Sequence, residues 1–578
     1  MSTFASYRLH ITPLSPVHIG TGESYEPTNY VIDDGVLHEF DTGAAMAAFS
    51  AEDRKELLTI ANRKPNEDMI KSLQSFFYQR RNILKAWAVN AIPVLPGVAQ
   101  LYAARVGQTA NREANGKQVL NRLEIDRTGY NPITRKPILF GSSLKGAIRT
   151  ALLNRENNEQ PAAEKKGLHP FQGRLFRYYD AENGKLYLER DPMRLFQISD
   201  AHWKQEPDLP AAQIHLAVNR KRAAVVDEKG QLRESMAEKK QLYQILECVP
   251  AWYYRAFTAQ INLRDVNSLG DLQNLPNRNL RYSMQTIAGS CNAFYQDILT
   301  AEIKQLNERG YLSTHWAQGV LRVFEVAKDK LRRGEAFLLR VGRHSGAESV
   351  TVSGTRNIRI MEGKDPITGK QQFSYAETPK TFWLAADTKD QRSGLLPFGW
   401  LLVEVQPLDA PEHEWPELRE LCETHLNTAR EFAAKRREQA EAMAKARAEA
   451  EAKRQEEEEK ERRKAEEEAR LAQEKAERQA RLAAMSADMQ AVEAFRTFYL
   501  EQKAKGRYQP GGLFDEKRRA IVTCALQWQD SDARRALATL LRQTVKEWTD
   551  WPNKKERKAE LRGWLEQLEN SSNWVDLH

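Results

Sequence analysis

The chain has 578 residues, a length that predicts three or four domains at roughly 150 residues each and excludes a single small fold. Charged residues make up 29% of the sequence and the formal net charge is +8, a mild bias toward an anionic partner that does not by itself establish nucleic-acid binding. No run of 18 apolar residues and no signal-peptide pattern occur, so we expect a cytoplasmic protein. The four cysteines, Cys248, Cys291, Cys422 and Cys524, form no C-x-x-C pair, which argues against a disulfide framework and a cysteine-based zinc site.

The N-terminal region begins with patterns typical of strands. Residues 7–14 alternate in polarity and lead into a glycine-rich segment, which predicts a strand followed by a loop. Two short apolar runs, Tyr30–Ile32 and Val36–Phe40, flank an Asp-Gly pair, and this pair supplies the positive φ angles of a tight turn. A β-hairpin is therefore predicted here.

Helices and further strands follow. Residues 51–90 are predicted to be largely helical, divided at Pro65, with Ser50 as the N-cap of the first helix. Aromatic and alternating residues predict strands at Ala251–Leu263 and Phe337–Val341. Because strands and helices alternate without a strict βαβ repeat, the sequence indicates an α+β fold.

The composition changes sharply after residue 410. Neither proline nor glycine occurs between Pro416 and Gly506, and from about Thr428 to Met485 the chain consists mainly of strong helix formers. Oppositely charged residues four apart stabilise such a helix in water. The run Lys453–Lys464 contains no apolar side chain, which excludes a continuous coiled-coil seam. We therefore expect one solvated helix of roughly 80 Å.

The last ninety residues regain the pattern of a folded domain. Apolar residues recur at helical spacing, and five tryptophans predict a small helical core: Trp528, Trp548, Trp551, Trp564 and Trp574. The predicted organisation is a region over residues 1–410, a charged helix or linker over 411–489, and an all-α domain over 490–578.

The most informative stretch is Pro137–Leu153, PILFGSSLKGAIRTALL. It predicts a short strand, a glycine-bounded loop and the start of a helix, a geometry that offers backbone N–H groups to an anion. The candidate phosphate-binding residues are Gly141, Ser142, Ser143, Lys145, Gly146 and Arg149. A nucleotide-binding P-loop is disfavoured because Ala147 and Ile148 follow the second glycine. The alternative is an ordinary capped turn between a strand and a helix.

Two other glycine-rich segments carry cations or histidines. Pro16–Gly22 follows the first strand and contains His18, Gly20 and Gly22. Residues 339–346 follow another predicted strand and contain Arg340, Gly342, Arg343 and His344. We hypothesise that the three segments converge in space and hold a nucleic-acid strand by its phosphates.

In order and spacing, four segments resemble the RAMP proteins of CRISPR effector complexes: HITPLSPVHIGTG, ILFGSSLKGAIRTALL, LRVGRHSGAESV and LLPFGWLLVEV. The resemblance covers about residues 5–405, and GSSLKGAIRTALL is most similar to the fifth-subunit family of the type III-A Csm complex. It implies RRM-related, ferredoxin-like domains, in two halves within residues 1–410, with helical insertions. It also implies a non-catalytic subunit that binds CRISPR RNA (crRNA) and other RAMP subunits, caps one end of the complex and assists crRNA maturation, with no cofactor.

The resemblance carries over to particular residues. Gly141, Ser142, Ser143, Lys145, Gly146 and Arg149 match the family's RNA-binding loop, and His18, Gly20, Gly22, Gly342 and Arg343 match its two other loops. The chain departs from the family at Phe140, where proline is more usual, and beyond residue 410, where no counterpart is known.

Two alternatives stay open at this point. The first is a metal-independent endoribonuclease with His18 as the general base, although a lone histidine without a partner acid favours a structural or RNA-contacting role. No metal-binding motif is present in the sequence. The second is an adaptor whose C-terminal region recruits a partner such as a host nuclease.

Overall fold

The computed structural model describes residues 4–64, 66–108, 123–159, 168–205, 209–231, 233–235, 238, 242–264, 274–549 and 554–570. Pro65, Trp551 and Trp574 lie outside these ranges. The chain forms two compact units, Met1–Ala448 and Glu449–His578. The division of the sequence at residues 410 and 489 stays a prediction.

A seven-stranded sheet forms the centre of the first unit. Its strands are ordered β13, β17, β1, β12, β9 and β7, and β8 also pairs with β12. Their bounds are β1 Phe4–Pro13, β7 Ile138–Leu139, β8 Phe196–Ile198, β9 Ala201–Trp203, β12 Phe257–Arg264, β13 Ala336–Arg340 and β17 Trp400–Pro407. β1 lies between two antiparallel neighbours, β12 and β17, and its C-terminal half, residues 9–13, is buried. The strands predicted at residues 7–14 and 337–341 are thus confirmed.

The strand predicted at Ala251–Leu263 is correct only from Phe257 onward. Trp252 and Arg255 have φ angles of 69° and 49°, so the preceding residues form a turn instead of extended backbone. Trp252 and Tyr253 are buried in the core around this turn. Their aromatic rings therefore serve packing and are not available for stacking on bases.

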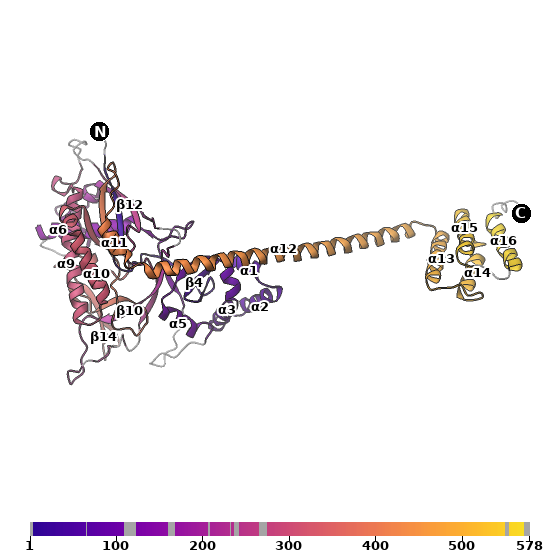
Figure 1. The fold of residues 1–578 in the computed structure, drawn as a ribbon, viewed down its shortest axis with the longest axis horizontal. Coiled ribbons are helices and arrows are strands. Elements are labelled where there is room, and N and C mark those ends of the chain that lie inside the picture. Colours follow the sequence, from indigo (N-terminus) through magenta and orange to yellow (C-terminus); the bar gives the residue numbers. More distant parts are fainter. Residues whose placement is uncertain are drawn as a thin grey trace. The chain divides into compact units, whose positions relative to one another are not determined.

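Three long helices pack beside the sheet near β13: α6 Gly141–Glu159, α9 Met284–Glu308 and α10 Thr314–Arg333 (Figure 1). α10 begins at the N-cap Ser313 and ends at Gly334, whose φ of 73° terminates the helix. Its buried residues recur every three or four positions, so one face of the helix lies against the core.

A second sheet of five strands has the order β16, β10, β11, β6 and β2, with bounds Thr381–Ala386, Gln213–Lys221, Tyr243–Cys248, Ile125–Thr128 and Gly20–Tyr25. A third sheet contains β3 Tyr30–Asp33, β4 Val36–Phe40 and β5 Ala88–Pro93. β3 and β4 form the predicted hairpin, and Asp34 and Gly35 adopt positive φ at its turn. A separate hairpin pairs β14 Ile358–Lys364 with β15 Gln371–Ala376.

Shorter helices surround these sheets: α1 Thr42–Ala48, α2 Ala51–Ala61, α3 Glu67–Gln79, α4 Arg81–Ala86, α5 Pro96–Arg105, α7 Leu168–Leu175 and α11 Pro416–Glu423. The Ser50 side chain accepts a hydrogen bond from the Asp53 N–H and caps α2, as predicted.

The charged segment forms α12, one helix of 57 residues over Asn427–Ala483. Most of its side chains beyond residue 448 are exposed, and ion pairs such as Glu456 with Lys460 connect successive turns. The predicted single helix is confirmed. In the part of the chain described, no helix is both long enough and apolar enough to span a membrane.

The C-terminal helices are α13 Ala487–Ala504, α14 Leu513–Ala525, α15 Ser531–Glu547 and α16 Lys554–Asn570. They enclose a hydrophobic core of their own, against which Trp528, Trp548 and Trp564 pack. A mixed α+β fold followed by a helical region is therefore confirmed.

Candidate functional site

The N-terminal glycine segment is buried up to Ile19 and exposed from Gly20 to Glu23. The His18 ring lies in the interior with no exposed surface, and its Nδ1–H donates to the Glu247 carbonyl oxygen at 2.7 Å. Burial lowers the pKa of His18, so the ring stays neutral at physiological pH. Only the backbone around Gly20 and Gly22 faces solvent here.

Beneath this segment lies the buried carboxyl group of Glu247. It accepts hydrogen bonds from the Tyr25 hydroxyl at 3.0 Å and from the Thr128 N–H at 3.1 Å. Burial raises the pKa of Glu247 to about 7. Glu247 thus supports the segment from below by linking β11 to β2 and β6.

The segment after β13 packs directly on the N-terminal one. The Arg343 N–H donates to the His18 carbonyl oxygen at 2.8 Å. Gly342 has a φ of 81°, and a Cβ at this position would lie 2.2 Å from that same oxygen. Glycine is therefore required here both by the backbone angle and by the close approach.

The side chains of this segment have different surroundings. Arg340 is 4% exposed, and its guanidinium donates to Glu302 and to the Phe398 carbonyl oxygen, each at 2.9 Å. His344 stacks on Trp383 with ring centroids 4.9 Å apart, and burial lowers its pKa to about 3. Arg343 alone of these three is exposed, and it forms an ion pair with Asp126.

The sequence predicted that the GSSLKG run forms a loop before a helix. This prediction is wrong, because Gly141 is already the first residue of α6. The Gly141 N–H donates to Asp200 Oδ1 at 2.8 Å, and a Cβ at Gly141 would lie 2.5 Å from the Ile198 carbonyl oxygen. The turn that enters the helix is packed too closely for a larger residue. Ser142 and Gly146 face solvent, whereas Ser143 is half-buried.

The two cations of the run are bonded within the chain. Lys145 is half-buried and donates to the Phe196 carbonyl oxygen at 2.9 Å, and burial lowers its pKa. Arg149 contacts both carboxylate oxygens of Asp191, at 3.2 and 2.8 Å, and also donates to Gln172. Arg149 therefore connects α6 to Gln172 and Asp191 through its guanidinium.

The three segments are neighbours in the fold, and their role in binding RNA stays a prediction. Gly129 connects two of them, because its N–H donates to the Ile19 carbonyl oxygen and its own carbonyl oxygen accepts from Ile138, each at 2.8 Å. The Tyr295 hydroxyl lies 3.0 Å from the Ala147 carbonyl oxygen and 3.4 Å from that of Ser349, between α6 and the segment after His344. Of the predicted residues in the three segments, the exposed ones are Gly20, Gly22, Ser142, Gly146 and Arg343.

Sequence reasoning missed the acceptors that hold these segments. Asp126, Asp191, Asp200 and Glu247 are distant in sequence from the groups they bind. For Asp126 alone the sequence offered a signal: it lies in a run of alternating apolar and polar residues before Gly129, which is typical of a strand. This pattern does not indicate which cation the carboxylate binds.

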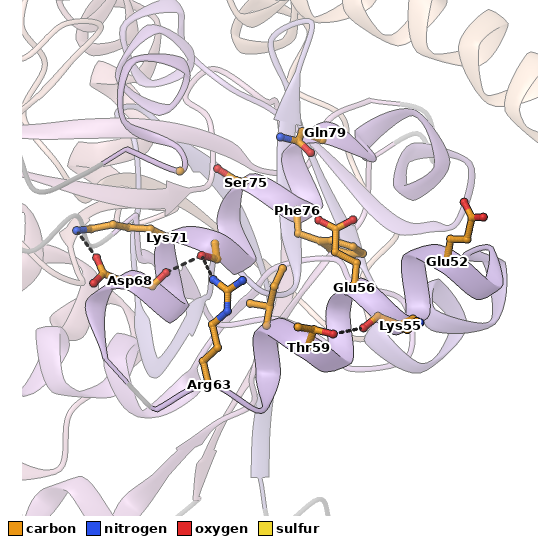
Figure 2. A pocket seen from close by; sticks show the side chains of 13 residues that line it. Glu52, Lys55, Glu56, Thr59, Arg63, Asp68, Lys71, Ser75, Phe76 and Gln79 are labelled. Atoms are coloured by element: carbon orange, nitrogen blue, oxygen red, sulfur yellow. Dashed lines mark hydrogen bonds and ion pairs between the residues drawn. The ribbon is translucent and has the colours of Figure 1, made fainter.

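A separate pocket of about 700 Å³ lies between α2 and α3 (Figure 2). Its lining carries charges of both signs: Lys55, Arg63 and Lys71 against Glu52, Glu56 and Asp68. Because the signs balance, this pocket offers no cationic cradle for phosphate. None of the three glycine segments lines it.

Comparison with known proteins agrees with the sequence resemblance. The RAMP superfamily model matches residues 10–391, and the chain belongs to this superfamily. A Csm5 protein of the CRISPR system of Streptococcus thermophilus is 25% identical over 205 residues, which cover 34% of this chain and 52% of that protein. The chain thus matches about half the length of this curated relative.

Two solved structures are also similar. A chain of a Csm–crRNA–target RNA ternary complex from a type III-A CRISPR-Cas system is 16% identical, with a TM-score of 0.41, and the match covers 69% of this chain and 100% of that one. The crystal structure of T. onnurineus Csm5 is 15% identical, with a TM-score of 0.38, over 68% of this chain and 99% of that one.

Proposed function

We propose that this chain is a non-catalytic, crRNA-binding subunit of a type III-A Csm complex. In this role it caps one end of the complex, contacts other RAMP subunits and assists crRNA maturation. The convergence of three glycine-containing segments within the RAMP region carries the proposal. Together with the similarity to a Csm5 protein, it favours crRNA as the ligand.

The proposed interface holds RNA by its backbone. Close approach to a phosphate is possible at Gly22 and Gly146, because no atom lies within 4 Å of the position of a Cβ there. Gly20 is exposed as well, but the His18 ring lies 3.2 Å from the position of its Cβ. Ser142 supplies a hydroxyl donor, Arg343 a guanidinium, and Lys145 an ammonium with donors beyond the one bonded to Phe196. Phosphate contacts carry no sequence information, so binding is expected to be indifferent to guide sequence and weaker at high salt.

The test is the double variant Lys145→Ala with Arg343→Ala. If each cation contacts one phosphate of a single strand, the slope of log K against log salt becomes shallower by about 1.4. The matched control is Arg332→Ala with Arg333→Ala, which removes two exposed cations at the end of α10. An unchanged affinity and slope in the first variant would show that these segments do not hold the guide.

The endoribonuclease alternative needs His18 at the surface. Its imidazole is buried, its Nδ1 is bonded to a backbone carbonyl, and a Cβ at Gly20 would lie 3.2 Å from its Nε2. A general base must reach the 2′-hydroxyl that it deprotonates. We therefore assign His18 a structural role. We expect no His18-dependent cleavage of a labelled precursor RNA: any cleavage by the unmodified chain should persist in His18→Ala.

A second function is favoured by the C-terminal region. Its helices have a core of their own and lie beyond the residues matched by the RAMP model. We propose that this unit recruits a partner protein such as a host nuclease. Removal of residues 449–578 is expected to leave crRNA loading intact and to abolish recruitment, and loss of loading would contradict the proposal.

A further inference from the structure

The exposed cation of the proposed interface is already bonded to an acid of the same chain. The Arg343 Nη1 lies 2.5 Å from Asp126 Oδ2, and the two side chains are 41% and 39% exposed. The Arg343 backbone is fixed by its hydrogen bond to His18, so the guanidinium remains near this acid. A carboxylate and a phosphate both accept hydrogen bonds from a guanidinium, and Arg343 donates one such bond to Asp126, from Nη1 to Oδ2.

The other arginines of the three segments also have acidic partners, but these pairs are closed. Arg340 and Glu302 are 4% and 6% exposed, and Arg149 and Asp191 are 23% and 14% exposed. Arg149 has further bonds to Gln172 and the Tyr178 hydroxyl. Of these three pairs, only Arg343 with Asp126 is open enough for an incoming anion to exchange with the carboxylate.

Asp126 is held in place by the sheet. It lies on β6, which pairs with β2 at Ser24 and with β11 at Leu246. Successive side chains of a strand point to opposite faces, so Asp126 shares a face with Thr128. The Thr128 Oγ1 accepts from the Ile19 N–H at 3.1 Å, which places this face under the N-terminal segment.

We propose that Asp126 occupies the phosphate position on Arg343 in the free chain and thereby lowers the affinity of this site for RNA. This inference rests on the proposed function. RNA then binds at Arg343 only by displacing the carboxylate, which afterwards lies close to a phosphate and repels it. Asp126 thereby weakens the binding of every RNA strand that reaches Arg343.

The test is Asp126→Asn in the full chain, because the amide keeps the shape of the side chain and removes its charge. A labelled 40-nucleotide polyuridine is expected to bind about two- to fivefold more tightly at low salt, as removal of an exposed charge beside a phosphate predicts. The salt slope is expected to change by less than about 0.7, because Arg343 contacts the same phosphate in both proteins. Asp126→Ser is expected to change affinity in the same direction.

The matched control is Glu335→Gln. Glu335 pairs with Arg333 at 2.8 Å, is similarly exposed, and is not part of the three segments. It removes the same charge, so it is expected to leave the affinity within about 1.5-fold, as is usual for an exposed pair outside an interface. An equal gain in this control would show that net charge, and not Asp126 itself, limits binding.

The double variant Asp126→Asn with Arg343→Ala completes a double-mutant cycle with the two single variants. If Asp126 acts through Arg343, the gain disappears in the Arg343→Ala background. The inference is overturned if Asp126→Asn binds RNA equally or more weakly, or if its gain persists without Arg343. If Arg343→Ala still weakens binding, either result overturns this inference alone and leaves the proposed function standing. If neither Lys145→Ala nor Arg343→Ala has an effect, the proposed function itself fails.

Discussion

Replacement of Gly342 by alanine is expected to break the junction between two of the glycine segments. At Gly342 the backbone φ is 81°, and an added Cβ would lie 2.2 Å from the His18 carbonyl oxygen. Two separate penalties therefore arise at one position. Gly310 offers a matched control, because its φ is 66° but a Cβ there would meet no atom within 4 Å.

The expected loss of stability follows from these two penalties. A non-glycine residue in the left-handed region costs about 1 to 2 kcal/mol, and this cost applies to Gly342→Ala and Gly310→Ala alike. Relief of the overlap with His18 requires the backbone to move, and such overpacking costs about 1 to 3 kcal/mol more. We expect a loss of about 2 to 5 kcal/mol for Gly342→Ala and about 1 to 2 kcal/mol for Gly310→Ala.

The assay is urea unfolding with pulsed hydrogen exchange, read on peptides from β13 and β17. These peptides report the first unit separately from the C-terminal helices. Equal losses for Gly342→Ala and Gly310→Ala would refute the reasoning, because they would show that the close approach of Gly342 to His18 contributes nothing beyond the φ angle.

Further predictions concern other parts of the chain. Burial lowers the pKa of His215 to about 4, so the unfolded state gains a proton below pH 6.5 that the folded state does not. The free energy of unfolding is expected to fall by up to about 3 kcal/mol between pH 6.5 and 4, and His215→Asn is expected to reduce this pH dependence in chemical unfolding. Arg518 is 1% exposed and pairs with Asp515, so Arg518→Ala is expected to destabilise the C-terminal helices by about 3 to 5 kcal/mol, measured by exchange of α14 peptides. Asp200→Ala removes the acceptor of the Gly141 N–H and is expected to cost about 1 kcal/mol in the unfolding of the first unit, whereas no change would show that this cap is dispensable.

The sequence was informative where glycines mark close contacts of the backbone. Gly141 and Gly342 each lie where a Cβ would collide with a backbone oxygen of a segment far away in sequence. Glycine patterns therefore pointed to segments that pack closely on distant parts of the chain, and their role in RNA binding stays a prediction. The charged helix was equally predictable, because its stability depends on neighbours four residues apart.

The burial and the hydrogen-bond partners of individual side chains could not be predicted in the same way. Arg340 and His18 look like ligands in the sequence, but Glu302 and the Glu247 backbone, both distant in sequence, bind them in the interior. The entry to α6 was misjudged for a related reason, since Asp200 satisfies the N–H of Gly141 and lets the helix begin there. Partners brought together only by the tertiary fold leave no periodic signal in the sequence.

The central claim is that RNA lies across the junction of the three segments. Photo-crosslinking of the full chain to a 4-thiouridine-labelled crRNA, followed by peptide mass spectrometry, tests it most directly. Crosslinks are expected within residues 20–23, 142–146 and 342–344, and are expected to weaken in the Lys145→Ala with Arg343→Ala variant. Crosslinks confined to the pocket between α2 and α3 or to the helices after residue 487, with none at the junction, would contradict the claim.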